Sequence, residues 1–305
     1  MTTNPVAAST SARRRRPVRN GRRWWWPFIV PASLLVALFF VVPFLLNVRF
    51  AFTTWTGYND DLDFSGFSNY QELIEQGILQ NSLRVTLVFA LVSMLIQNSV
   101  SLSLALLLEK TSRINTVFRS IFFIPVLIAP VAAGYIWQAL LAPEGPVNGT
   151  IRIFAPGFAY AWLGHPTSAL ICVAFVEAWK WSGLATLVYI AGLNAVPRTV
   201  LEAAILDGTT AWQRFWRVRF PLLAPAFTFT VVTSLMGSMN AYDVVMATTV
   251  GGPGVATNLL NIAMWHEWSS GFFGTASALG LTLTLVVVVA TLPLVRYLRS
   301  REVAA

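Results

Sequence analysis

Six long apolar runs constrain the fold of this chain more than any other feature of its sequence. The hydrocarbon core of a bilayer is about 30 Å thick, so a helix of about 20 apolar residues spans it. Hydrophobic residues make up 56% of the chain and charged residues only 11%, a balance typical of membrane proteins. The sequence therefore predicts an all-α integral membrane protein with six transmembrane helices. These apolar runs lie at residues 26–48, 85–108, 120–141, 168–192, 222–247 and 275–297.

The basic residues indicate how these helices are oriented, because Lys and Arg are enriched in cytoplasmic segments. If the N-terminus is cytoplasmic, 17 of the 21 basic residues lie on the cytoplasmic side. We therefore expect both termini in the cytoplasm, with a basic tail over 1–25, an external segment over 49–83 and a C-terminal tail over 299–305. Seven acidic residues would then lie outside: Asp60, Asp61, Asp63, Glu72, Glu75, Glu144 and Glu267.

The first apolar run follows seven arginines, as the core of a secretory signal would. The run is longer than a signal core and no small-residue cleavage site follows it convincingly, so the sequence predicts an uncleaved first transmembrane helix over 26–48. Trp24–Trp26 are expected at the membrane interface, where tryptophan is enriched.

The formal net charge of +8 raises the question of a nucleic-acid partner. The positive charge is distributed loop by loop, as membrane topology requires, and does not gather on one folded face. We therefore expect no nucleic-acid partner, and we expect the arginine-rich tail to face lipid headgroups.

The sequence lacks the patterns that common classes of enzyme need. Lys110 and Lys180 are its only lysines, and neither follows the glycine-rich turn of a nucleotide-binding loop. His165 and His266 lie far apart, with no Gly-x-Ser-x-Gly motif and no metal-ligand spacing. Cys172 is the only cysteine and lies inside an apolar run. The sequence predicts a protein that is not an enzyme and holds no cofactor or metal of its own.

The polar loop over 193–221 contains two helix patterns. Good helix formers over Thr199–Leu206 are followed by Gly208, a residue that commonly ends helices. A second helix is expected over Ala211–Phe220, followed by Pro221 at the start of the fifth span. An amphipathic connector lying on the membrane surface would show the same periodicity. Aromatic residues at helical spacing mark one side of the second helix: Trp212, Phe215 and Trp216.

The order of residues in this loop resembles the EAA signature of permease subunits in bacterial ABC importers. The matching residues are Glu202, Ala203, Ala204, Gly208, Val218, Phe220 and Pro221. Val218 and Phe220 replace the usual Ile and Leu and keep the apolar character. Further similarity to the maltose and glycerol-phosphate branch lies in Ala191-Gly192-Leu193, Val196-Pro197, Asp207-Gly208 and Gly251-Gly252-Pro253.

This resemblance implies a type-1 ABC importer transmembrane domain over 84–298, with five of the helices and a cytoplasmic coupling loop. It implies that the loop docks on a separate ATPase dimer, which holds the ATP and Mg. It also implies a second permease subunit, an extracytoplasmic solute-binding protein and a location in the bacterial cytoplasmic membrane. The residues that would couple to the ATPase are Glu202, Ala203, Ala204, Asp207 and Gly208.

Ionisable residues at membrane depth are costly and mark candidate sites for the transported solute. Glu177, Lys180 and Trp181 lie at i, i+3 and i+4 in the fourth span, with Leu184 following on the same face. Carboxylates bind sugar hydroxyls and aromatic rings pack on sugar faces, so this face suits a sugar. Alternatively, Glu177 and Lys180 neutralise one another within a helix interface.

Polar residues in the fifth span are a second candidate part of the pathway. Ser238 and Asn240 are expected to line the cavity, although such residues also bond to backbone carbonyls. In the third span, Pro125 and Pro130 predict a kink.

Three interpretations of function remain open at this point. The resemblance favours an importer of a sugar or small oligosaccharide, with glycerol phosphate as the competing cargo. An ion-coupled secondary carrier would use Glu177 and Asp243 as proton-linked groups, but it would not need the loop over 193–221. A channel or membrane scaffold would not need that loop either.

Overall fold

The computed structural model describes residues 26–58 and 62–302. The basic tail over 1–25, Asp60, Asp61 and residues 303–305 lie outside the described residues. The described part is helical and contains no β-sheet, with one isolated bridge between Thr53 and Phe64. The chain divides into two compact units, Met1–Leu46 and Asn47–Ala305.

Residues 26–50 form one apolar helical run. Its segments are α1 (Trp26–Val36), η2 (Ala37–Val41) and α2 (Val42–Phe50). The middle segment is π-helical, with Val42 N–H donating to the Ala37 carbonyl. The next residue is Pro43, which has no N–H to donate and whose ring crowds the carbonyl four residues earlier. A widened turn relieves that clash.

The second unit contains three long helices that are each apolar enough to cross a membrane: α4 (Ile78–Leu108), α8 (Pro166–Ala195) and α15 (Phe273–Arg299). Two further pairs are sharply bent. The angle is 101° between α5 (Arg113–Leu127) and α6 (Pro130–Leu140), and 70° where Ala211–Leu222 meets α12 (Ala224–Met239). With the first apolar run, which is also long enough, the described residues contain four such helices, or up to six if each bent pair is one span.

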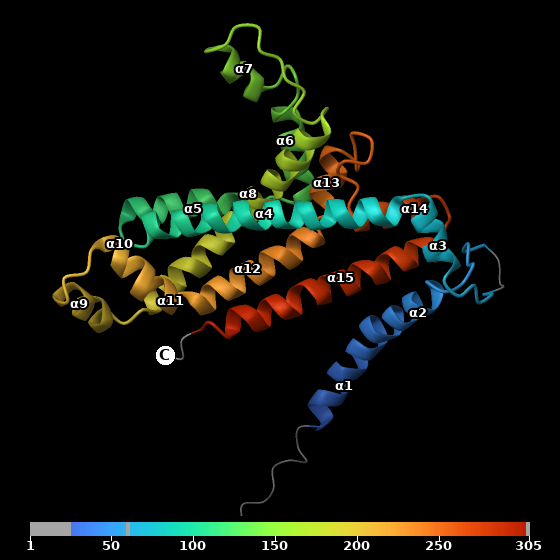
Figure 1. Ribbon diagram of the computed structural model, residues 1–305, viewed down its shortest axis with the longest axis horizontal. Coiled ribbons are helices and arrows are strands. Elements are labelled where there is room, and N and C mark those ends of the chain that lie inside the picture. The colour runs from blue at the N-terminus through green and yellow to red at the C-terminus, as the bar shows by residue number, and fades with distance from the viewer. Residues whose placement is uncertain (1–25, 59–61, 303–305) are drawn as a thin grey trace, which may run out of the picture. The chain divides into compact units, whose positions relative to one another are not determined.

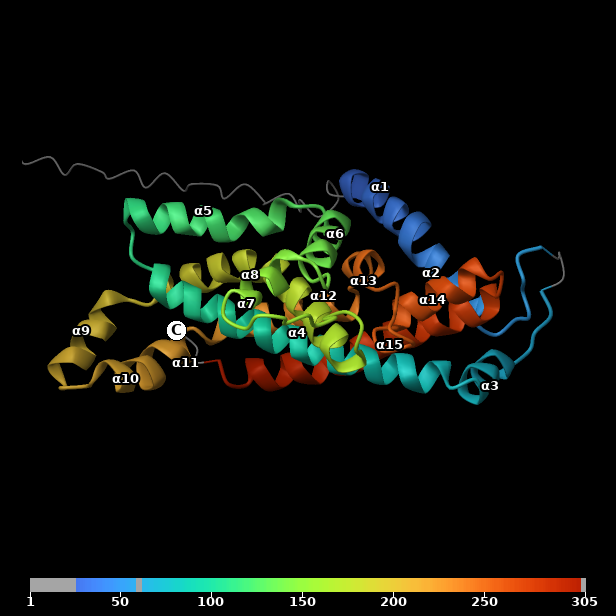
Figure 2. The ribbon, with the colours of Figure 1, turned by 90° about the horizontal axis from the view of Figure 1, so that it is seen from above.

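Shorter helices complete the second unit: α3 (Ser68–Glu75), α7 (Pro146–Arg152), α9 (Arg198–Leu206), α10 (Ala211–Arg214), η3 (Phe215–Arg219), α11 (Phe220–Leu222), α13 (Asp243–Thr248) and α14 (Leu260–Ser269). In Figures 1 and 2, α4, α12 and α15 run side by side. The helices α9 to α11 gather at the end of this unit where α15 finishes, and α3 and α14 lie at the opposite end.

Two predicted spans are not continuous helices. The run over 120–141 breaks at Ile128 and Ala129, whose ψ angles are 134° and 137°. Pro130 explains this break, because a proline pushes the residue before it into an extended conformation. The predicted kink is therefore confirmed, as a complete interruption. The run over 222–247 ends α12 at Met239, where the Asn240 amide donates to the Met236 carbonyl and satisfies a terminal acceptor.

The fifth span also begins later than expected. Pro221 lies inside α11, and α12 begins at Ala224 after a bend. The loop prediction is otherwise accurate, since α8 ends before Pro197 and helices occupy 198–206 and 211–222.

Small residues let the central helices approach closely. A Cβ on Gly183 of α8 would lie 2.3 Å from the Phe122 carbonyl oxygen of α5. A Cβ on Gly192 would lie 2.6 Å from the Cβ of Ala226 in α12. Such contacts replace the hydrophobic driving force that lipid-embedded helices lack.

A buried polar cluster joins three helices at their crossing. The Asn98 amide on α4 donates to Ser234 Oγ on α12 at 2.8 Å, and the Tyr189 hydroxyl on α8 donates to Asn98 Oδ1 at 2.7 Å. Because each donor and acceptor is met inside the protein, this polar cluster is tolerated at membrane depth.

We predict that Gly183→Ala destabilises the protein by about 1–3 kcal/mol, because the new methyl group meets backbone atoms that cannot rotate away. The measurement is the thermal unfolding of the purified protein in detergent. Gly237→Ala is the matched control, since Gly237 lies in a spanning helix with open space around it. Equal stability of the two variants would contradict the close approach of α5 and α8.

Candidate functional site

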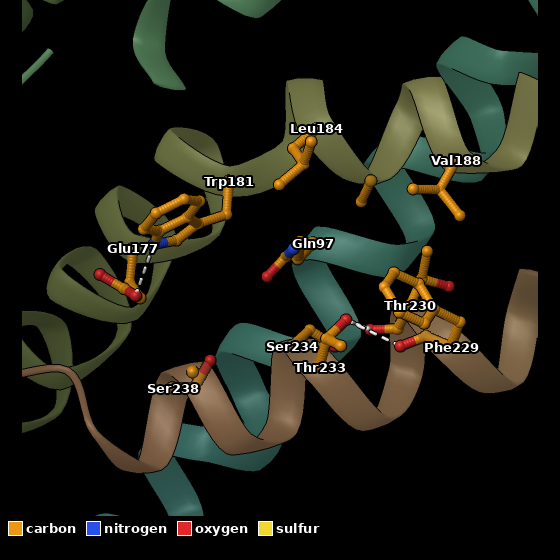
Figure 3. A pocket seen from close by; sticks show the side chains of 12 residues that line it. Gln97, Glu177, Trp181, Leu184, Val188, Phe229, Thr230, Thr233, Ser234 and Ser238 are labelled. Atoms are coloured by element: carbon orange, nitrogen blue, oxygen red, sulfur yellow. Dashed lines mark hydrogen bonds between the residues drawn. The ribbon is translucent and has the colours of Figure 1, made fainter. Parts of the chain in front are cut away.

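A cavity of about 240 Å³ lies between α8 and α12 (Figure 3). Side chains from α8 form one wall, side chains from α12 the other, and α4 contributes one amide. Its lining residues are Gln97, Glu177, Trp181, Leu184, Ala185, Val188, Phe229, Thr230, Thr233, Ser234, Gly237 and Ser238. Four of the six predicted pathway residues, Glu177, Trp181, Leu184 and Ser238, therefore meet at one cavity.

Among the described residues, Glu177 is the only ionisable one in this lining. Its side chain is buried, and Trp181 Nε1 donates a hydrogen bond of 2.9 Å to Glu177 Oε1 (Figure 3). The two residues are one helical turn apart on α8, which is why the bond forms. It holds a carboxylate beside an aromatic ring at the cavity wall.

Lys180 lies outside the cavity lining. Its Nζ donates to the Ile128 carbonyl at 2.9 Å and to the Val126 carbonyl at 3.4 Å. Val126 lies in the last turn of α5 and Ile128 in the interruption before α6, where helical partners are missing. The ammonium also meets the partial negative charge of a helix C-terminus. No ion pair joins Glu177 and Lys180 within the described residues.

The two polar residues predicted in the fifth span differ in position. Ser238 lines the cavity, is buried and has no hydrogen-bond partner for its hydroxyl among the described residues. Asn240 is exposed, bonds to its own helix and does not line the cavity. Asp243 begins α13, beyond the break that ends α12.

Sequence reasoning missed most of the α12 wall and the α4 contribution. Thr230 and Ser234 precede Ser238 at spacings of four, so all three lie on one helical face. That spacing was visible in the sequence. Gln97 was visible too, as a polar residue within an apolar run.

The loop over 193–221 ends its first helix as predicted. Gly208 has φ of 72°, a left-handed conformation that favours glycine. Its N–H donates to the Ile205 carbonyl, and Thr209 N–H donates to the Ala204 carbonyl. These bonds form the Schellman motif that closes a helix C-terminus. Thr210 and Gln213 then form a capping box that starts α10.

Most of the five residues predicted to contact an ATPase are exposed. Glu202, Ala203, Asp207 and Gly208 lie at the surface, and Ala204 is buried. The neighbouring Leu206 is an apolar side chain that is 88% exposed. The loop also carries the predicted aromatic side, with the Trp212 and Trp216 ring centroids 5.5 Å apart.

The family model described as "binding-protein-dependent transport system inner membrane component" matches residues 97–301. The chain belongs to this family. The family confirms the resemblance drawn from the EAA-like loop, and it makes the chain an inner-membrane transport component.

Individual relatives match this inner membrane component over most of their length. A probable starch degradation products transport system permease protein, AmyD of Thermoanaerobacterium thermosulfurigenes, is 29% identical over 90% of this chain and 94% of its own. The sn-glycerol-3-phosphate transport system permease protein UgpA of Rhizobium meliloti is 30% identical, over 78% and 82%. The crystal structure of a bacterial alginate ABC transporter bound to its alginate pentasaccharide-loaded periplasmic protein has a chain of the same fold. The TM-score of the match is 0.77 and the sequence identity is 18%. The match covers 93% of this chain and 97% of that chain.

Membership of this family rules against the ion-coupled carrier and the channel or scaffold interpretations. Inner membrane components of such systems are transport subunits and not enzymes.

We predict that Lys180→Met destabilises this inner membrane component by about 1.5–3 kcal/mol, because two carbonyls at membrane depth lose a charged donor. Thermal unfolding of the purified complex measures the effect. Asn240→Ala serves as the control, since Asn240 is exposed and bonds only to its own helix. An unchanged stability for Lys180→Met would contradict a structural role for the ammonium.

Proposed function

We propose that this chain is the permease of an ATP-driven importer that passes a neutral sugar or small oligosaccharide across the bacterial cytoplasmic membrane. The observation that carries the proposal is the cavity between α8 and α12, which pairs the Glu177 carboxylate with the Trp181 ring. A carboxylate accepts hydrogen bonds from sugar hydroxyls, and an indole packs on the apolar face of a pyranose. The hydroxyls of the α12 wall add further partners.

The electrostatics of the cavity favour a neutral cargo over glycerol phosphate. The only ionisable lining group is a carboxylate, which repels a phosphate. Lys180, whose Nζ lies 4.5 Å from the Trp181 ring centroid, already donates to the carbonyls of Val126 and Ile128. The names of the relatives include both starch products and glycerol 3-phosphate, and the charge at the cavity supports the neutral cargo.

We propose six spans with both termini in the cytoplasm, each bent pair crossing the membrane once. The type-1 core then occupies 84–298, and its coupling loop 193–221 is cytoplasmic. The distribution of basic residues supports this orientation. The same end of the second unit carries α9 to α11 and the end of α15, and it is rich in arginine: Arg198, Arg214, Arg217, Arg219, Arg296, Arg299 and Arg301.

One such chain provides part of a pathway, so we propose an assembly with a second permease, an ATPase dimer and an extracytoplasmic solute-binding protein. ATP and Mg would bind to the ATPase. The alginate transporter binds a periplasmic protein, which supports the last of these partners. The exposed surface of α9 around Glu202 and Ala203 is the proposed ATPase dock, because its apolar neighbours Ile205 and Leu206 are also exposed.

We predict that Ala203→Arg abolishes copurification of the ATPase, because a long charged side chain replaces a methyl group at the dock. The measurement is affinity purification of the tagged chain from membranes. Ser300→Arg is the control, since Ser300 is exposed in the C-terminal segment and lies outside α9. Retention of the ATPase by Ala203→Arg would place the dock elsewhere.

We predict that Glu177→Gln and Trp181→Leu each lower uptake of neutral saccharides by about tenfold, because each removes one cargo-binding group. Uptake is measured with radiolabelled maltodextrins and glycerol 3-phosphate in proteoliposomes that contain the whole importer. Leu187→Ala is the control, as an exposed position on α8 outside the cavity. Wild-type uptake of glycerol 3-phosphate without saccharide uptake would contradict the cargo assignment.

A further inference from the structure

One ion pair connects the coupling loop to the end of a long helix. Glu109 follows directly after α4, and its carboxylate accepts from the Arg219 guanidinium in η3. The two residues are 110 positions apart in the chain. Their side chains are only 23% and 20% exposed, so water screens the pair less than it would screen a surface pair.

Within the described residues, this pair is the only hydrogen bond or ion pair that joins residues 198–222 to a spanning helix other than α12. The helix α12 directly follows these residues in the chain. The other hydrogen bonds of the segment are local, such as the capping box of Thr210 and Gln213. Aromatic packing links the segment to α12, with the Phe220 and Phe227 ring centroids 5.4 Å apart. The ion pair between Glu109 and Arg219 is therefore the polar link between residues 198–222 and α4.

The turn that carries Glu109 is itself fixed. Arg119 of α5 donates from Nε to the Leu108 carbonyl and from Nη2 to the Glu109 carbonyl, each at 3.0 Å. The Asn115 amide donates to the Lys110 carbonyl at 2.8 Å. These bonds cap the C-terminus of α4 with side chains of α5. A force on the Glu109 carboxylate is thus passed to the backbone of α4.

A π-helical turn orients the side chain of Arg219. In this turn, Phe220 N–H donates to the Phe215 carbonyl. Pro221 follows and lacks an N–H, as Pro43 does after η2. One additional residue in a turn rotates the following side chains by about 100° relative to a regular α-helix. The π-turn therefore helps set the side of the helix from which Arg219 reaches Glu109.

The helix α4 extends from the ion pair to the cavity. Gln97 of α4 lines the cavity, and Asn98 bonds to Ser234 of α12 and Tyr189 of α8, the two helices whose side chains form the cavity walls. Gln97 is 12 residues from Glu109, about 18 Å along a rigid helix.

We propose that Glu109 and Arg219 are positioning residues that transmit movement of the coupling loop to α4 and so to the cavity. The inference rests on the proposed function, because it assumes an ATPase that moves α9. A shift of η3 moves the Glu109 carboxylate through the ion pair, and the capped C-terminus of α4 moves with it. Without the pair, the loop still docks on the ATPase, but α4 loses its polar connection to it.

The test uses the complete importer in proteoliposomes, with E109Q, R219Q, the double variant E109Q/R219Q and R219K. The readout is the stimulation of ATP hydrolysis by cargo-loaded binding protein, divided by the unstimulated rate. We expect a fall of at least fivefold in each single Gln variant, no further fall in the double variant and at least half the wild-type ratio in R219K. R217Q is the charge-matched control, since Arg217 is exposed in the same turn, and its ratio should equal wild type.

A wild-type ratio in E109Q and R219Q would overturn the proposal, and so would effects that multiply in the double variant. If a single variant fails to assemble because it leaves one charge unpaired, the double variant decides, since it leaves neither charge. An assembled double variant with normal stimulation overturns the proposal, and one with reduced stimulation supports it. Failure of the proposed importer function is distinct, because wild type would then copurify no ATPase or show no ATP-driven uptake.

Discussion

The contact between the Lys180 ammonium and the carbonyls of Val126 and Ile128 is the interaction on which the candidate site depends. Broken helices are tolerated at membrane depth only where other groups satisfy the freed backbone. Lys180 supplies that partner at the 101° bend between α5 and α6. Because the Lys180 ammonium binds these carbonyls, Glu177 is the only ionisable group among the described residues that line the adjacent cavity.

Close approach and polar pairing together hold the walls of the cavity. Gly183 and Gly192 bring α8 against α5 and α12, since neither contact leaves room for a side chain. Asn98 joins α4 to α8 through Tyr189 and to α12 through Ser234. Hydrophobic burial contributes little between helices in lipid, so these contacts carry much of the specificity of the fold.

The loop over 193–221 shows how local sequence rules build an exposed helix surface. The Schellman motif at Gly208 and the capping box at Thr210 satisfy the polar groups of two short helices without using the rest of the protein. This local closure leaves the α9 surface around Ala203 free, while η3 turns Arg219 toward Glu109. The same short loop thus exposes α9 to solvent and is joined to the end of α4 through Arg219.

The sequence by itself determined the helical class, the approximate positions of the apolar runs and the helix ends of the coupling loop. These features depend on residue composition and on neighbours within one turn, as at Gly208 and at the break before Pro130. The same local rules placed Glu177, Trp181 and Leu184 on one helical face, but they also placed Lys180 there. Only the tertiary structure decided that Lys180 turns to α5, that Ser234 and Gln97 join the cavity and that Glu109 meets Arg219. Periodicity along one helix cannot show which other helix lies beside it, because that depends on contacts between residues far apart in the chain.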